Sequence, residues 1–376
     1  MVGILRELSG EGVSLWLDGL GRDRLADGGL TRLVRDRCVV GATGALGDGD
    51  AYREQLAALA AGATAAIALR ELTVSDLRWA CEVLEPVYLR TAGLDGLVSA
   101  RIDPSFIEGT CLTLAEARSL HLAVDRPNLL MEIPATPEAL PAITRCLGEG
   151  IGVHVSLVLT EERYRQVLEA FLAGLELAVA NGLDVSRINS VAGLPVGLLD
   201  TVLDHELDLI GTPEARAFRG QGGIALARLA YRRYERALGS ARWTGLAARG
   251  ARPQRLLWDA TEVMDRRYRD TRYAEELVAA NSVTLLSEQT LTALADHGPR
   301  LGGPVRRRVR GRRAGARLPG PVRRRPAEAA GRRRVRGPGR PAPGQGGAAG
   351  AGAGPAGRVR HRPLTDRQPR PTSPIP

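Results

Sequence analysis

The chain has 376 residues, of which 44% are hydrophobic and 25% charged, so it can bury a full core as one large barrel or as two medium domains. Its formal charge of +10 arises from the end of the chain: residues 300–376 hold 21 of the 52 basic residues and two acids, Glu328 and Asp366, whereas residues 1–299 are net acidic. All 52 basic residues are arginine, which excludes any mechanism that uses a lysine amine as nucleophile.

The sequence shows no cysteine spacing typical of a metal site, no targeting signal and no membrane span. The four cysteines are widely spaced and have no histidine partner at metal-ligand spacing: Cys38, Cys81, Cys111 and Cys146. We therefore expect reduced thiols in a cytoplasmic protein with no metal and no cofactor. The start of the chain is too charged for a signal peptide, and no apolar stretch reaches the length of about 18 residues that a membrane span needs, so no membrane partner is expected.

Short aliphatic runs alternate with segments of helical periodicity up to about residue 298. The eight runs are Val13–Leu17, Cys38–Ala42, Leu97–Ile102, Leu129–Ile133, Val153–Leu159, Arg187–Val191, Arg255–Trp258 and Val283–Leu285. Among the predicted helices are Glu161–Ala180 and Gly211–Leu238. Eight such repeats predict an α/β fold, a (β/α)8 TIM barrel over residues 1–299. The alternative, an open doubly wound sheet, would carry a glycine-rich fingerprint after its first strand, and none is present.

The last part of the chain differs in composition. Residues 301–376 hold 13 of the 23 prolines and no Phe, Tyr, Trp, Met or Cys, so residues 300–376 are predicted to be a disordered, arginine-rich, low-complexity tail. One interpretation is an arm that binds nucleic acid or another polyanion through phosphate contacts. The other is an out-of-frame reading of GC-rich codons, which the abrupt change after Gly298 favours.

Several segments before this tail match one family in order and at nearly constant spacing. They are Val13–Asp18 (VSLWLD), Asp125–Leu129 (DRPNL), Ile133–Thr136 (IPAT), Phe171–Glu176 (FLAGLE) and Gly250–Arg255 (GARPQR). Through them the chain resembles the bacterial transaldolase family over about residues 3–299. The resemblance implies a barrel that moves a dihydroxyacetone unit between sugar phosphates of the pentose phosphate pathway. In that family a lysine before the Pro-Ala-Thr turn forms a Schiff base with the ketose, and an Asp and a Glu on the first and third strands handle protons.

The positions that carry this chemistry are largely replaced. Glu132 stands where the resemblance places the Schiff-base lysine, Arg101 where it places the third-strand Glu, and Asp18 is retained. Five further positions of the substrate pocket also differ or lie in altered segments: Thr43 in a shortened turn that lacks the family's Asn, His154 and Ser156 for an Asn and a Thr, and Gly193 and Leu198 for the phosphate-holding Ser and Arg.

The replaced charges predict a new contact, because Arg101 and Glu132 exchange the signs of the family's Glu and Lys on neighbouring strands. We expect them to form an ion pair inside the barrel, where a lone charge would be costly. Glu132 is either that structural partner or a catalytic carboxylate. Asp18 is a general acid–base group or a loop cap, and His154 is an acid–base group or a core histidine. Ser156 is expected to be a hydrogen-bonding residue.

Three functions follow from these residues. The preferred one is a transaldolase-family protein that keeps the fold and has lost Schiff-base catalysis. The second is a repurposed, lysine-free acid–base enzyme acting on a small polar metabolite through Asp18, Glu132 and His154, with Arg101 beside them. The third is a non-catalytic binding protein whose tail engages polyanions.

Overall fold

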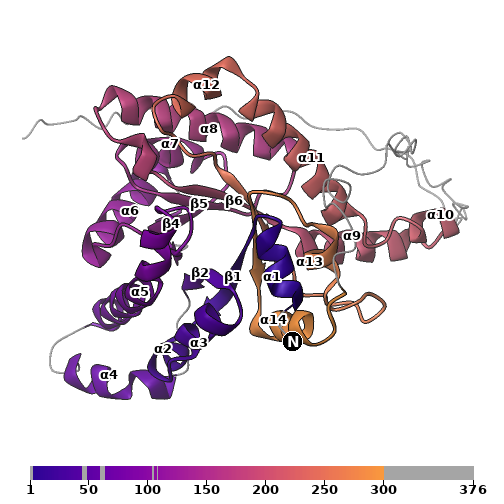
Figure 1. Ribbon diagram of the computed structural model, residues 1–376, viewed down its shortest axis with the longest axis horizontal. Coiled ribbons are helices and arrows are strands. Elements are labelled where there is room, and N and C mark those ends of the chain that lie inside the picture. The colour runs from indigo at the N-terminus through magenta and orange to yellow at the C-terminus, as the bar shows by residue number, and fades with distance from the viewer. Residues whose placement is uncertain (1–2, 45–48, 60–63, 104–105, 108, 300–376) are drawn as a thin grey trace, which may run out of the picture. The chain divides into compact units, whose positions relative to one another are not determined.

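Eight parallel strands form a closed barrel in the order β1 to β8, with helices around it (Figure 1). The computed structural model describes residues 3–44, 49–59, 64–103, 106–107 and 109–299. The predicted TIM barrel is therefore confirmed, and the open doubly wound sheet is not formed. The tail predicted at 300–376 lies outside the described residues, so its two interpretations and the boundary at 299 stay predictions.

The strands and helices alternate along the chain as a (β/α)8 fold requires. The strands are β1 (Val13–Leu20), β2 (Val39–Gly44), β3 (Leu97–Arg101), β4 (Leu129–Pro134), β5 (Val153–Ser156), β6 (Ser190–Pro195), β7 (Arg255–Asp259) and β8 (Ser282–Leu286). The first helices are α1 (Gly3–Gly10), α2 (Arg22–Ala26), α3 (Gly29–Asp36), α4 (Arg53–Leu59), α5 (Ala65–Arg90), α6 (Thr110–Val124) and α7 (Leu140–Gly148). The others are α8 (Glu161–Ala180), α9 (Val196–Ile210), α10 (Pro213–Arg216), α11 (Gly222–Leu238), α12 (Ala241–Ala247), α13 (Arg272–Glu276) and α14 (Glu288–His297). No helix in the described ranges is long and apolar enough to cross a membrane.

Helix ends show where local chemistry decided the boundaries. The prediction of α8 is confirmed at both ends: the Thr160 side chain accepts the Arg163 N–H and caps the first turn, and the helix ends at Ala180 before Asn181. The single helix predicted over Gly211–Leu238 is wrong. Gly211 has a φ of 73° and ends α9, after which α10 and α11 follow as separate helices.

The predicted strands differ from the observed bounds by one to four residues, and two of these differences have a visible cause in the backbone. The run Val153–Leu159 forms a strand only as far as Ser156, because Leu157 has a φ of 58°, which an extended strand cannot accommodate. The run Arg187–Val191 enters β6 only at Ser190, because Val185–Arg187 forms a 3-10 turn.

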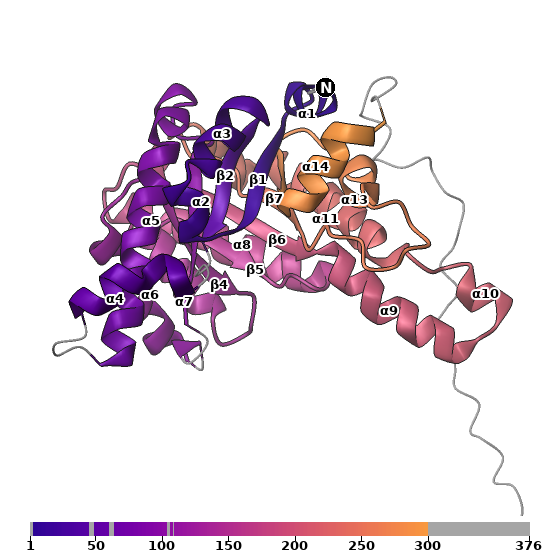
Figure 2. The same ribbon diagram turned by 90° about the horizontal axis from the view of Figure 1, so that it is seen from below.

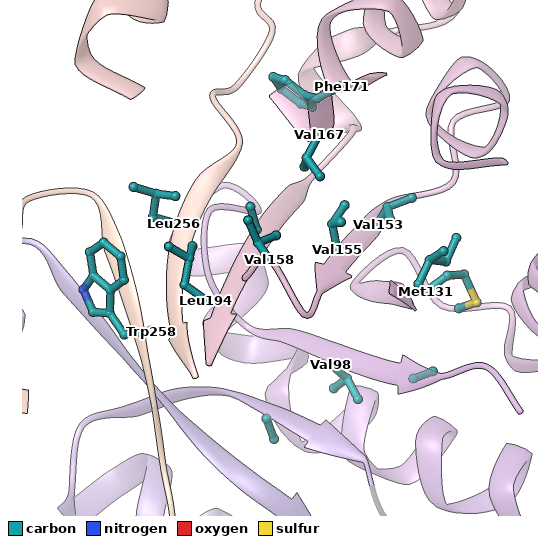
Figure 3. Close-up of a cluster of buried hydrophobic side chains, with 14 of the residues drawn as sticks. Val98, Met131, Val153, Val155, Val158, Val167, Phe171, Leu194, Leu256 and Trp258 are labelled. Carbon is teal, nitrogen blue, oxygen red and sulfur yellow. The ribbon is translucent and has the colours of Figure 1, made fainter. Parts of the chain in front are cut away.

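The main core lies between the barrel wall and the surrounding helices. Figure 3 shows Val153 and Val155 of β5 pointing toward Val167 and Phe171 of α8. All four side chains are at most 1% exposed. Since side chains alternate across a strand, this outward packing of β5 directs His154 and Ser156 into the barrel.

The barrel interior is a packed core rather than a channel. A separate cluster of buried side chains fills it around Trp16: Leu97, Leu130, Val191, Leu257, Val283 and Leu285. Gly41 of β2 faces the Trp16 indole, and a Cβ added there would lie 2.4 Å from Trp16 Nε1. The bulk of Trp16 thus requires glycine on the neighbouring strand.

Gly41→Ala is therefore expected to lower the free energy of unfolding by about 1–3 kcal/mol, the usual cost of overpacking a rigid core. The measurement is urea denaturation at equilibrium. Gly245→Ala is the matched control, since a Cβ at Gly245 meets nothing within 4 Å. Equal stability of the two variants would show that Trp16 can move aside.

The base of the barrel is closed by a buried arginine. Arg255, at the start of β7, is 4% exposed, and its Nη1 donates to Ser14 Oγ at 2.7 Å and to Asp95 Oδ1 at 3.0 Å. Its Nη2 donates to the Leu94 carbonyl at 2.8 Å. These contacts connect β1, β7 and the segment that precedes β3 at the strands' N-terminal end.

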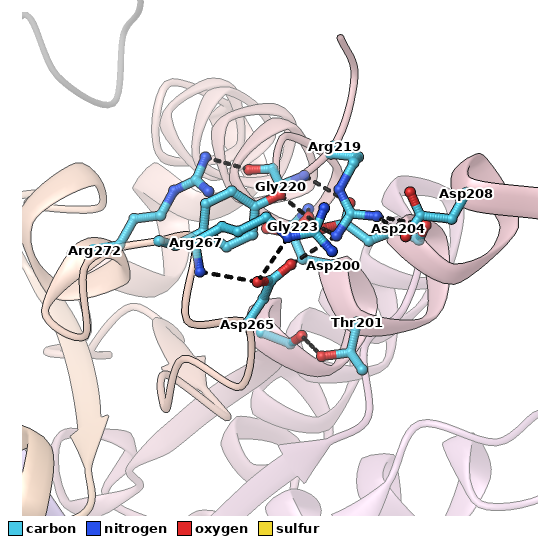
Figure 4. Close-up of polar contacts among 12 residues, drawn as sticks. Asp200, Thr201, Asp204, Asp208, Arg219, Gly220, Gly223, Asp265, Arg267 and Arg272 are labelled. Atoms are coloured by element: carbon cyan, nitrogen blue, oxygen red, sulfur yellow. Dashed lines mark hydrogen bonds and ion pairs between the residues drawn. The ribbon is translucent and has the colours of Figure 1, made fainter. Parts of the chain in front are cut away.

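Two carboxylates of α9 hold the loop that follows β7 (Figure 4). Asp200 accepts the Gly223 N–H at 2.7 Å and the Tyr273 hydroxyl at 2.9 Å. Asp204 accepts the Gly220 N–H at 2.7 Å and the Tyr268 hydroxyl at 2.8 Å. Figure 2 shows α9 extending away from the barrel toward α10. The start of α11 and the chain after β7 are thereby attached to one helix.

Candidate active site

Three site residues predicted from the sequence form a row across adjacent strands. Arg101 of β3 is in register with Glu132 of β4, and Glu132 is in register with His154 of β5. Register partners in parallel strands present their side chains on the same face. Because Arg101 is the last residue of β3, the row reaches the C-terminal mouth of the barrel, where barrel enzymes place their chemistry.

The predicted pairing of Arg101 with Glu132 is confirmed. Arg101 Nε lies 3.4 Å from Glu132 Oε1. The expectation that both charges are inside the barrel is wrong, however, because the Arg101 side chain is 67% exposed against 11% for Glu132. Arg101 is the last residue of β3, so its long side chain reaches solvent at the barrel mouth.

His154 is buried, and one of its two ring nitrogens has a polar contact, so both of its predicted roles stay open. It is 1% exposed, its Nδ1 lies 2.8 Å from Ser99 Oγ, and Glu132 Oε2 lies 3.9 Å from the same nitrogen. Nε2 has no hydrogen-bond partner among the described residues. A Cβ at Gly193 would stand 2.9 Å from Nε2, so the glycine at this position leaves room for the ring.

Asp18 and Thr43 contact each other at the ends of β1 and β2. The Thr43 hydroxyl donates to Asp18 Oδ1 at 2.8 Å and accepts the Gly19 N–H at 3.0 Å. Thr43 is buried, whereas Asp18 is exposed. Asp18 thus joins the two strand ends and still faces solvent, so both of its predicted roles stay open.

Asp259 is a site residue that the sequence analysis missed. It is the last residue of β7, and its Oδ1 accepts the Ala260 N–H at 2.6 Å. Burial raises the pKa of Asp259; the neighbouring His154 and the hydrogen bond from the Ala260 N–H oppose this rise, and Asp18 and Glu132 add to it. The signal was present, since Asp259 directly follows a predicted strand.

The other predicted positions contribute less. Ser156 ends β5 and is 5% exposed. Leu198 lies in the first turn of α9 and is 47% exposed. Neither Gly193 nor Leu198 offers a side-chain donor for an anion, so these two positions cannot hold a phosphate through side chains.

Asp259→Asn is expected to raise the melting temperature by a few degrees at neutral pH and to change little at about pH 3. The pKa of Asp259 is raised in the folded chain, so its ionisation costs stability as pH rises from about 4, the unfolded value, through the folded value. An amide removes that loss.

Melting curves against pH measure this effect, and Asp184→Asn is the control of opposite sign. Hydrogen bonds from Ser186 lower the pKa of Asp184, so its carboxylate contributes stability above its unfolded pKa and the amide should lower the melting temperature at neutral pH. A pH profile of Asp259→Asn parallel to that of the native chain would contradict the assignment.

The site brings together groups that move protons. Asp18, Glu132 and Asp259 supply carboxyl groups, His154 an imidazole and Arg101 a guanidinium. The carboxyl groups and the imidazole can act as general acids and bases, whereas the guanidinium stays protonated, and none of these groups is an amine that could attack a carbonyl. No cluster of three or more His, Cys, Asp or Glu in the described part of the chain is placed to hold a metal.

Comparison with known proteins identifies the family. The family profile "Transaldolase/Fructose-6-phosphate aldolase" matches residues 15–309. The chain is 50% identical to "Transaldolase" of Thermobifida fusca (strain YX) over 310 residues, 80% of this chain and 84% of that protein. It is 46% identical to "Transaldolase 2" of Streptomyces coelicolor over 313 residues, 81% of this chain and 84% of that protein. With the closed eight-stranded barrel, these matches show that the chain belongs to the transaldolase family.

Proposed function

We propose that this protein is a transaldolase-family barrel that no longer performs the family's Schiff-base step. One observation carries the proposal: the residue before Ile133-Pro134, where the resemblance places the reactive lysine, is Glu132, and its carboxylate pairs with Arg101. A carboxylate cannot condense with a ketone to form an imine, and a guanidinium stays protonated.

No other side chain can take over the missing role. The 376 residues contain no lysine, so the imine cannot move to a neighbouring strand. The site is also unfavourable for a phosphorylated substrate, because Arg101 already pairs with Glu132, and the carboxyl groups of Asp18 and Glu132 are near that of Asp259. A phosphate dianion would be repelled by this negative charge, and Gly193 and Leu198 have no side-chain donors to hold it.

A coupled transaldolase assay with fructose 6-phosphate and erythrose 4-phosphate tests the proposal. We expect no turnover above background, with an active transaldolase measured in parallel. When borohydride is added to the native protein and dihydroxyacetone, the masses of the peptides from the barrel should stay unchanged. Turnover by the native chain would overturn the proposal, because it would require a lysine-free route.

A second function is favoured by Asp259. Burial raises the pKa of Asp259, and Glu132 and His154 are near enough to influence its charge; carboxyl groups in such different environments suit proton removal next to a carbonyl. The substrate would be a small polar metabolite, and the reaction an isomerisation, a dehydration or a lysine-free aldol step.

Proton exchange detects this chemistry without knowledge of the natural substrate. Dihydroxyacetone in D2O should exchange its carbon-bound protons faster with native protein than with Glu132→Gln or Asp259→Asn, as followed by proton NMR. Equal exchange rates in all three proteins would contradict this second function and leave the first proposal, the loss of Schiff-base catalysis. Polyanion binding by residues 300–376 stays a prediction, which salt-dependent binding of the full chain and of a chain ending at Gly298 would check.

A further inference from the structure

A cavity of about 710 Å³ lies beside the barrel mouth, outside the row of site residues. Its walls come from α5 and α6, from the ends of β1 and β2, and from the residues that end and follow β3. This volume is typical of sites that bind small molecules. Arg101 is the one member of the row that also lines the cavity.

The cavity has an apolar floor and an apolar rim. Leu77 and Leu120, which are each 3% exposed, form part of the floor. Ile67, Leu69 and Phe106 line it as well and are 52%, 45% and 38% exposed. Three large apolar side chains exposed around one concave surface indicate a place where an apolar group binds.

Most charged groups of the lining already have partners. Arg70 pairs with Glu116 at 2.6 Å, and the Asp76 carboxylate receives Arg22 at 2.6 Å and the Tyr52 hydroxyl at 2.7 Å. Asp103 also has an interaction partner. These groups therefore have little need of a ligand's charge.

Arg101 differs from them. Its single contact in the described part of the chain runs from Nε to Glu132 at 3.4 Å, a long distance for a charge-assisted hydrogen bond. Its two terminal nitrogens donate to no described residue, and the side chain is 67% exposed. A guanidinium with free terminal nitrogens presents the planar pair of donors that a carboxylate matches.

We propose that this cavity binds a small monocarboxylate with an aromatic or branched apolar body. The carboxylate would receive hydrogen bonds from the terminal nitrogens of Arg101, and the body would pack on Ile67, Leu77 and Phe106. A single negative charge fits best, because Asp103 lines the same cavity and Glu132 pairs with the same guanidinium, so both carboxylates would repel a dianion. This site is separate from the proposed function, and only Arg101 is common to both.

Isothermal titration of the full chain with 1-naphthoate tests the proposal. Binding should be saturable at physiological ionic strength, and the neutral 1-naphthamide should bind about tenfold more weakly, as should 1-naphthoate to Arg101→Leu. Arg187→Leu is the charge-matched control, since Arg187 is 84% exposed and lies outside the cavity lining. The arginines of the tail add the same background to every variant.

A second variant tests the cavity itself. Thr73→Phe places a ring in the space between α5 and α6 and should weaken 1-naphthoate binding at least tenfold. Thr244→Phe is its control, because both threonines donate to the carbonyl four residues earlier in an exposed helix, and Thr244 lies on α12. Absence of 1-naphthoate binding to the native chain would overturn the proposal. Occupation of the cavity by another segment of this chain would prevent binding and would overturn it in the same way. Equal affinity of native chain, Arg101→Leu and Thr73→Phe would overturn it too.

Discussion

Exchanging the two charges at the barrel mouth, Arg101→Glu together with Glu132→Lys, is expected to create an amine that borohydride traps on dihydroxyacetone. The new lysine would replace a carboxylate that is 11% exposed, and partial burial lowers the pKa of an amine and leaves part of it neutral and nucleophilic. Loss of water forms the imine, and hydride reduces it to a stable secondary amine.

The composition of the chain makes this experiment unusually clean. Because the native sequence has no lysine, the new side chain is the only one that can react in this way. Mass spectrometry of tryptic peptides should show the peptide around residue 132 heavier by dihydroxyacetone less one oxygen. The native chain and Glu132→Gln, which have no amine at this position, should show no such peptide.

The single variant Glu132→Lys separates reactivity from stability. It places a second cation against Arg101, whose Nε lies 3.4 Å from the present carboxylate, so it should melt at a lower temperature than the double variant. Absence of the adduct from both variants, with both folded, would show that the mouth no longer admits a ketone to this position. Loss of the lysine would then not be the only change that removed the family chemistry.

Arg255→Met is expected to lower the free energy of unfolding by about 3–5 kcal/mol, the largest effect on stability that we predict. The substitution removes the guanidinium from the base of the barrel and leaves the Asp95 carboxylate, which is 14% exposed, without its cation. It also removes the donors to Ser14 and to the Leu94 carbonyl. A buried charge left unpaired costs far more than a surface charge.

Urea denaturation measures the loss, and Arg242→Met is the control. Arg242 pairs with Glu169 and Glu176 on the surface, so its replacement should cost about 0–1 kcal/mol. The double variant Arg255→Met/Asp95→Leu should recover part of the loss by removing the uncompensated carboxylate. If Arg255→Met and Arg242→Met lost equal stability, the ion pair at the barrel base would be unimportant.

The sequence alone predicted the barrel, because each strand is a local apolar run with its own turn residues. It also predicted the Arg101–Glu132 contact, since the two changes reverse sign on strands that neighbour each other in a barrel. The helix α8 followed from a regular spacing of apolar residues, and the structure adds the Thr160 cap at its start. The break at Gly211 was missed, although the glycine was visible, because helical periodicity continued on both sides of it.

The tertiary structure decided what depends on long-range register and on side-chain reach. The register of β4 against β5 placed His154 beside Glu132, and beside Gly193 the second ring nitrogen of His154 has no hydrogen-bond partner among the described residues. Asp259 joined the site because closure of the barrel brings β7 near β1 and β4, residues more than a hundred positions away. Exposure of Arg101 and the cavity beside it likewise depend on how α5 and α6 pack. Local propensity specifies strands and helices, whereas burial and electrostatic neighbours are fixed only when distant segments meet.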